Sequence, residues 1–74
     1  MAKVQAKSEV SGSVWKIEVA VGQSVAVGDI LMLIESMKME IPVVVEGSGG
    51  KVASLLVAEG EAIVEGQTVA TLDT

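Results

Sequence analysis

The sequence of 74 residues contains no cysteine, histidine, arginine, tyrosine or phenylalanine, and Trp15 is its one aromatic residue. These absences exclude a cysteine nucleophile, a histidine base, a zinc site of Cys and His, and an arginine clamp for phosphate. No disulfide can form, which favours the cytoplasm mildly without deciding the compartment. The formal net charge of −5 disfavours nucleic acid and anionic membranes, because both require basic protein surfaces. We therefore expect neither catalytic residues nor a metal site.

Long hydrophobic runs are also missing. The longest strongly apolar run, residues 30–34, is far shorter than the roughly 20 residues of a membrane-spanning helix. The first residues, from Met1 onward, lack the apolar stretch of a signal peptide. We expect a soluble, cytoplasmic protein, and the length allows one small domain over residues 1–74.

The chain contains an internal repeat. Sliding it along itself by 38 positions aligns residues 12–35 with residues 50–73 without a gap, and six of the 24 pairs are identical. The identical pairs are glycines and small or apolar residues: Gly12, Val14, Val19, Ala20, Gly22 and Gly28 align with Gly50, Val52, Val57, Ala58, Gly60 and Gly66. This pattern predicts two copies of one half-domain, related by an approximate two-fold axis.

Short alternating apolar segments rich in β-branched residues, separated by glycine turns, predict an all-β barrel or sandwich. Pro42 lacks an N–H group, so its strand is expected at a sheet edge or with the nitrogen of Pro42 facing outward. The Gly-rich residues 47–50 open no helix and lack a Lys-Ser/Thr ending, so we interpret the glycines as turns and not as a phosphate-binding loop. The expected strands are residues 3–7, 12–20, 25–27, 30–35, 40–46, 50–58, 63–65 and 68–73.

Residues 35–40, with the sequence ESMKME, fall between two predicted strands. If Met37 and Lys38 form a two-residue turn, apolar residues face one another along the hairpin, although the tip lacks the usual Asn-Gly or Asp-Gly. Two interpretations remain open. Met37 or Met39 fills a gap in the core and Lys38 is a solvated turn residue, or the three form an exposed segment that another protein binds. The predicted facing pairs are Ser36 with Met39, Glu35 with Glu40, Ile34 with Ile41, Met32 with Val43, and Ile30 with Val45.

A lysine amine is mostly protonated near neutral pH and is then a poor nucleophile. The composition offers no group that would deprotonate Lys38. Any acylation of Lys38 must therefore be driven by another enzyme that supplies an activated acyl donor.

The segment Glu35-Ser36-Met37-Lys38-Met39-Glu40 resembles the biotin-attachment signature of biotinyl domains in the biotin/lipoyl attachment family. The spaced glycines of residues 21–31 and 46–52 are similar to the family pattern, and the resemblance covers roughly residues 8–73. Two features depart from it: Ser36 stands where the family usually has Ala, and residues 9–12 replace a proline-rich start. The length is similar to that of free-standing biotin/lipoyl attachment proteins.

The resemblance implies a flattened β-barrel of two four-stranded antiparallel sheets with Lys38 at an exposed hairpin tip. It also implies that a biotin protein ligase attaches biotin to Lys38 through an amide bond, using biotinyl-adenylate. The biotin would carry carboxyl groups between a biotin carboxylase and a carboxyltransferase, such as those of an acyl-CoA carboxylase. The chain would thus be a carrier domain, monomeric on its own, and not an enzyme. The expected recognition residues are Met37, Met39, Glu35, Ser36 and Glu40.

Three alternatives remain at this stage. The first is a lipoyl carrier, or a dual biotin/lipoyl acceptor, which would share the fold, although lipoyl domains typically flank the lysine with Asp and Ala. An unmodified interaction module predicts that Lys38→Ala leaves function intact. An enzyme that uses Glu35 and Glu40 is disfavoured, because an exposed tip lacks the enclosed cleft that such chemistry needs.

Overall fold

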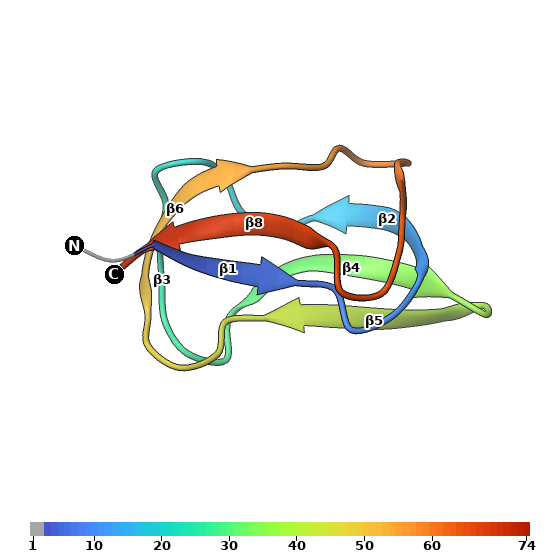
Figure 1. Ribbon diagram of the computed structural model, residues 1–74, viewed down its shortest axis with the longest axis horizontal. Helices are drawn as coiled ribbons and strands as arrows, with labels where there is room; N and C mark the ends of the chain where they lie inside the picture. The colour runs from blue at the N-terminus through green and yellow to red at the C-terminus, as the bar shows by residue number, and fades with distance from the viewer. Residues whose placement is uncertain (1–2) are drawn as a thin grey trace.

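The computed structural model describes residues 3–74, which form eight strands and no helix (Figure 1). Two four-stranded antiparallel sheets have the strand orders β1-β8-β6-β3 and β5-β4-β2-β7. The predicted all-β fold is confirmed, with Pro42 on the edge strand β5 as expected. Met1 and Ala2, which the predicted domain includes, lie outside the described residues. The strands are β1 (Lys3–Lys7), β2 (Gly12–Ile17), β3 (Ser24–Val25), β4 (Ile30–Ser36), β5 (Met39–Val44), β6 (Gly50–Leu55), β7 (Ala62–Ile63) and β8 (Thr68–Asp73).

Over residues 3–74 there is no helix long and apolar enough to cross a membrane.

The internal repeat is visible in the strand order. Under the shift of 38, β2, β3 and β4 correspond to β6, β7 and β8, so one sheet maps onto the other strand by strand. The short strands change sides: β3 of the first half borders β6, and β7 of the second half borders β2. Each half therefore completes the sheet of the other, which makes the two halves one folding unit.

This exchange explains why several strands end earlier than predicted. The long segments expected at 12–20 and 50–58 stop at Ile17 and Leu55. Beyond these ends the chain turns toward the opposite sheet, where Gly22 N donates to Val52 O at 2.8 Å and Gly60 N donates to Val14 O at 2.7 Å. The strands expected at 25–27, 40–46 and 63–65 likewise end early, at Val25, Val44 and Ile63.

Four glycines, Gly22, Gly28, Gly60 and Gly66, lie in turns as predicted, whereas Gly12 and Gly50 are the first residues of β2 and β6. Gly22 has a φ of 92° in a turn where Gln23 N donates to Ala20 O, and the Gln23 side-chain oxygen accepts from Ala20 N. A positive φ at the third residue of such a turn is the type II geometry, which requires glycine or asparagine. The repeat places Gly60 in an equivalent turn with a φ of 87°.

One predicted register is wrong. Ile30 pairs with Val44 and not with Val45, because a β-bulge at Leu31 inserts one residue between the Ile30 and Met32 pairs. Leu31 and Met32 are both fully buried, so the bulge directs two consecutive side chains into the core. Strand alternation alone cannot reveal such an extra residue.

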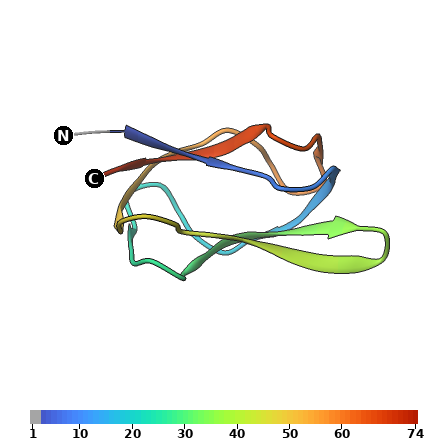
Figure 2. The same cartoon turned by 60° about the horizontal axis from the view of Figure 1, so that its bottom comes forward.

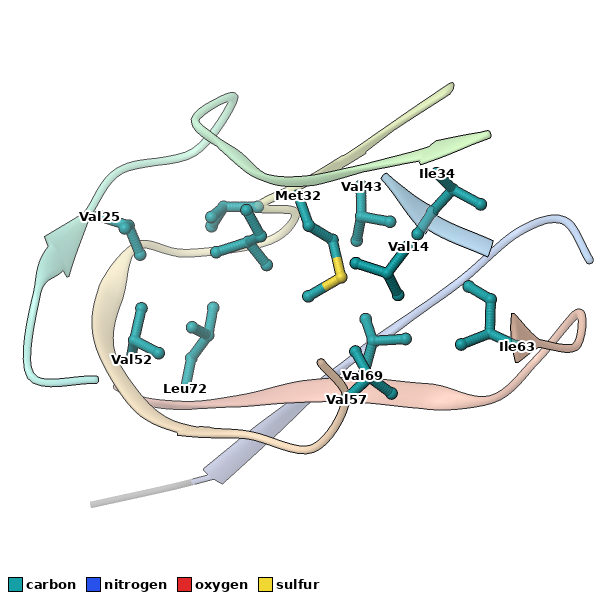
Figure 3. Packing of buried hydrophobic residues seen from close by; sticks show 12 residues of the cluster. Val14, Val25, Met32, Ile34, Val43, Val52, Val57, Ile63, Val69 and Leu72 are labelled. Atoms are coloured by element: carbon teal, nitrogen blue, oxygen red, sulfur yellow. The ribbon is translucent and has the colours of Figure 1, made fainter. Parts of the chain in front are cut away.

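Twelve apolar side chains fill the space between the sheets (Figure 3). The thioether of Met32 lies among them, near Val14 and Val43, which is the gap-filling role that methionine often has in cores. The core residues are Val14, Val25, Leu31, Met32, Ile34, Val43, Val45, Val52, Val57, Ile63, Val69 and Leu72.

Candidate functional site

The hairpin of β4 and β5 projects beyond the other strands at one end of the molecule (Figure 2). The molecule is elongated, 36 Å by 19 Å by 19 Å, and the hairpin tip lies at the end opposite the chain termini (Figure 1). The paired residues are Ser36 with Met39, Glu35 with Glu40, and Ile34 with Ile41, which confirms the predicted register around the tip.

Met37 and Lys38 form the turn, with φ values of 52° and 65°. Among residues 3–74 they are the only non-glycine residues with positive φ. A two-residue turn with two positive φ values matches the twist of a hairpin but normally uses Asn-Gly or Asp-Gly. Each ordinary side chain in this conformation costs about 1–2 kcal/mol. Turn stability therefore does not account for these two residues, and such local strain is typical of functional sites.

The methionines beside Lys38 are not core residues. Met37 is 91% exposed and Met39 is 63% exposed, whereas Met32 is fully buried. The interpretation of Met37 or Met39 as a core gap-filler is wrong. Lys38 is exposed between them, so the tip presents a primary amine flanked by two flexible thioethers that a partner protein can contact.

Two carboxylates flank the tip, one on each strand of the hairpin. Glu35 and Glu40 are exposed and stand directly opposite each other in the sheet. Like charges at opposed positions destabilise a strand pair, so this is a second feature of the hairpin that the fold does not favour. Together with Lys38 they give the tip two negative charges and one positive charge.

The hairpin is fixed to the body of the molecule next to its turn. Ser36 Oγ donates to Ser11 O at 2.8 Å, and Ser11 Oγ accepts from the backbone N–H of Glu65 at 2.9 Å. Beside this contact, Gly12 lies so close to the carbonyl oxygen of Glu35 that a Cβ atom would overlap it. The strand is thus held at Ser36, directly before the exposed turn begins.

Sequence reasoning did not identify Ser11 or Gly12 as parts of the site. Ser11 acts on Ser36 through its main-chain carbonyl, which has no sequence signature. For Gly12 a signal existed in the repeat, because the equivalent Gly50 packs in the same way against the carbonyl of Asp73.

A groove of about 290 Å³ runs between β1 and β5 and lies apart from the tip. Its lining includes Val4, Ala6, Ile34, Ile41 and Val43 but none of residues 35–40. The amine of Lys38 is therefore presented on a projection and not inside this groove. An exposed lysine of this kind is suited to enter the active site of another protein.

The family model Biotin_lipoyl, described as "Biotin-requiring enzyme", matches residues 4–72. The chain belongs to the biotin/lipoyl family. This confirms the family predicted from the sequence. The biotinylated protein TB7.3 homolog of Mycobacterium leprae is 39% identical to this biotin/lipoyl domain over 66 residues, which are 89% of this chain and 92% of that protein. The biotin/lipoyl attachment protein of Bacillus subtilis is 36% identical over 86% of each chain.

Larger proteins contain similar segments. The biotin-dependent acyl-coenzyme A carboxylase alpha3 subunit of Mycobacterium leprae is 41% identical over 61 residues, 82% of this domain but only 10% of that subunit. Among solved structures, the Kluyveromyces lactis urea carboxylase matches 99% of this domain with a TM-score of 0.89 and 34% identity, using 6% of its own chain. A single-chain, multi-domain long-chain acyl-CoA carboxylase shares the fold, with a TM-score of 0.86 at 19% identity.

Proposed function

We propose that this domain is a biotin carboxyl carrier, with biotin attached to Nζ of Lys38. The observation that carries the proposal is the tip itself: Lys38 sits in a strained left-handed turn between two exposed methionines, on a projection that no described groove encloses. The names of the relatives support biotin as the group, since one is a biotinylated protein and another a biotin-dependent carboxylase subunit.

The residues of the tip fit a covalently attached group. Lys38 offers an exposed ammonium group, which would lose one proton to become a nucleophilic amine. The amine nitrogen would then displace AMP from a biotinyl-adenylate held by a biotin protein ligase and lose a second proton as the amide forms. The ligase would supply the base for both protons. Met37 and Met39 would be the contacts that such a ligase recognises, with Glu35, Ser36 and Glu40 completing the segment.

Once attached, biotin supplies a group that accepts a carboxyl group at a biotin carboxylase and releases it at a carboxyltransferase. The domain contributes position only. The hydrogen bond from Ser36 to Ser11 fixes the hairpin next to its turn, and the two-residue turn keeps Lys38 exposed at the tip. This domain would be the moving arm of a carboxylase, acting in the cytoplasm.

Intact mass spectrometry, followed by peptide mapping, tests the proposal. The domain is expressed with a biotin protein ligase, with a lipoyl ligase, and with neither. We expect a biotin adduct on Lys38 with the first, and none in Lys38→Arg, which keeps the charge but cannot form the amide. A lipoyl adduct without a biotin adduct would establish the lipoyl carrier instead, a candidate that the name of the Bacillus subtilis relative keeps open.

A second step tests the carrier role. The biotinylated domain is incubated with the biotin carboxylase of its host, ATP and radiolabelled bicarbonate, and label should appear on the wild type only after biotinylation. Absence of label on a fully biotinylated domain contradicts the proposed function. Streptavidin blotting of cell fractions checks the cytoplasmic location.

A further inference from the structure

The outward faces of the two sheets differ in chemistry. Outward positions follow from the strand alternation, because the residues next to them, such as Ile34 and Leu72, are buried in the core. On the sheet of β1, β8, β6 and β3 the paired outward residues are polar: Lys3, Asp73 and Lys51 in one row, Gln5, Thr71 and Ser54 in the next, and Lys7 with Thr68 in a third. On the sheet of the hairpin, Pro42 and Leu33 share a row with Lys16, Val44 pairs with Ile30, and Trp15 lies at a bulge beside them.

We call Trp15, Ile30, Leu33, Pro42 and Val44 the apolar face. Trp15 is 51% exposed and Ile30 is 40% exposed. Pro42 is also exposed, and Leu33 and Val44 are half-buried. The single aromatic residue of the chain thus lies on the surface, where tryptophan is enriched at the energetic centres of protein interfaces.

The repeat shows that the fold does not require these apolar residues. The shift of 38 aligns Ile30 with Thr68 and Leu33 with Thr71, and the bulge residue Trp15 with the bulge residue Ala53. The strand partners follow the same rule, since Pro42 pairs with Leu33 as Gln5 pairs with Thr71, and Val44 pairs with Ile30 as Lys7 pairs with Thr68. At four of these five equivalent positions one sheet carries a polar residue and the other an apolar residue, and at the fifth the small Ala53 corresponds to Trp15.

Charge defines what can cover the apolar face. Glu35 and Glu40 point outward from the same two strands, between the apolar face and the tip. Lys16 is the one lysine in the strands of this sheet, and it forms an ion pair with Glu18 at 3.6 Å and not with Glu35 or Glu40. A second copy of this chain is disfavoured as the occupant, because each copy would bring its own carboxylates and a net charge of −5. A protein surface with an apolar centre and lysines or arginines facing Glu35 and Glu40 is complementary.

We propose that the apolar face docks onto the biotin carboxylase that this domain serves. The inference rests on the proposed function. Charge favours the carboxylase over the ligase, because amide formation removes the positive charge of Lys38 and leaves Glu35 and Glu40 as the charges of the hairpin. A basic docking surface therefore binds the modified domain, which returns to the carboxylase in every cycle, more tightly than the unmodified domain that the ligase meets.

Steady-state kinetics with the fully biotinylated domain tests this docking. The biotin carboxylase of the host is assayed with ATP and radiolabelled bicarbonate over a range of domain concentrations. In the variant Trp15→Ala/Leu33→Thr, each residue takes the identity of its repeat partner. We expect the KM for the domain to rise about tenfold with kcat unchanged, since docking away from the reacting group affects binding of substrate and transition state equally. The control Gln5→Ala, on the polar sheet, should stay within twofold of wild type.

A second measurement uses only the wild-type domain, so its result does not depend on how well the variant folds. Because Trp15 is the one tryptophan, the ¹⁵N-labelled wild-type domain has a single indole N–H signal. Addition of unlabelled biotin carboxylase should shift or broaden this signal, and the effect should be stronger for the biotinylated than for the unmodified domain.

Two results would show that the apolar face does not dock onto the carboxylase: a KM within twofold of wild type in the folded variant, or an indole signal unchanged at saturating carboxylase. Two others would assign the face to a different occupant. A slower ligase reaction with an unchanged carboxylase KM would assign it to the ligase, and a wild-type dimer that Leu33→Thr dissociates would assign it to a second copy of the chain. A biotinylated wild type that accepts no label refutes the proposed function itself, and the docking with it. Labelled wild type with an unchanged KM refutes the docking alone.

Discussion

Asparagine at position 37 should make the domain more stable and less active as a substrate for its ligase. Met37 has a φ of 52°, in the left-handed region that asparagine tolerates better than most side chains. It is also 91% exposed, so its replacement removes almost no buried surface. Met37→Asn therefore separates what the turn needs from what the partner recognises.

The expected change in the free energy of unfolding follows from two opposing terms. Full burial of a methionine stabilises by about 1.5–3 kcal/mol, and Met37 has less than a tenth of its surface buried, so about 0.2 kcal/mol is lost. An ordinary residue in the left-handed region costs about 1–2 kcal/mol, of which asparagine relieves roughly half. The net gain is about 0.5 kcal/mol, which corresponds to a Tm increase of about 2–4 °C for a domain of this size.

Differential scanning calorimetry and ligase kinetics on the same preparations measure the two effects. Because asparagine cannot replace the thioether of Met37 against the ligase, kcat/KM for biotinylation should fall about tenfold. Met39→Asn is the matched control, since Met39 lies in β5 without a positive φ and asparagine is unfavourable in strands, so its Tm should fall. A lower Tm for Met37→Asn, or a raised Tm with unchanged biotinylation, would refute the view that Met37 is kept for recognition.

Four further substitutions test the supports of the hairpin and the assignment of the core. In Gly12→Ala the new Cβ meets the carbonyl of Glu35, so urea denaturation should show a free energy of unfolding lower by about 1–3 kcal/mol. No measurable decrease would mean that β2 and β4 can move apart at this point without cost. Ser36→Ala removes one hydrogen bond and should cost about 1 kcal/mol and speed hydrogen exchange at the tip, while biotinylation stays within twofold because the lost hydroxyl is bonded within the domain, to Ser11 O. A large loss of biotinylation would instead assign the Ser36 hydroxyl a direct role. Met32→Ala should lower the free energy of unfolding by about 2–5 kcal/mol, and Met39→Ala by less than about 1 kcal/mol. The reverse order would mean that Met39, and not Met32, belongs to the core.

Features that depend on local alternation could be predicted from the sequence. The hairpin register was predictable because apolar residues continue in step through Ile34 and Ile41 on both sides of the turn. The bulge at Leu31 was not, since an extra residue among apolar neighbours leaves no mark in composition. The early end of β2 was also hidden, because it depends on the contact of Gly22 with the other half of the chain.

Family resemblance predicts a role for Lys38 and its neighbours, and that role stays a prediction. The strain at the tip was not predictable, because the positive φ values of Met37 and Lys38 are visible only in the folded backbone. The hydrogen bond between Ser36 and Ser11 joins residues 25 positions apart, and only the folded chain brings them together.

The pairing of Lys3 with Asp73 has a practical consequence for protein engineering. The first and last strands lie side by side, and the two chain termini lie together at the end of the molecule opposite the hairpin tip (Figure 1). The domain can therefore be grafted into a surface loop of a host protein through two short linkers, without spreading the ends of that loop. If Lys38 is biotinylated as proposed, such a graft would carry the modified lysine at the far end of a domain 36 Å long, as a handle for immobilising or labelling the host.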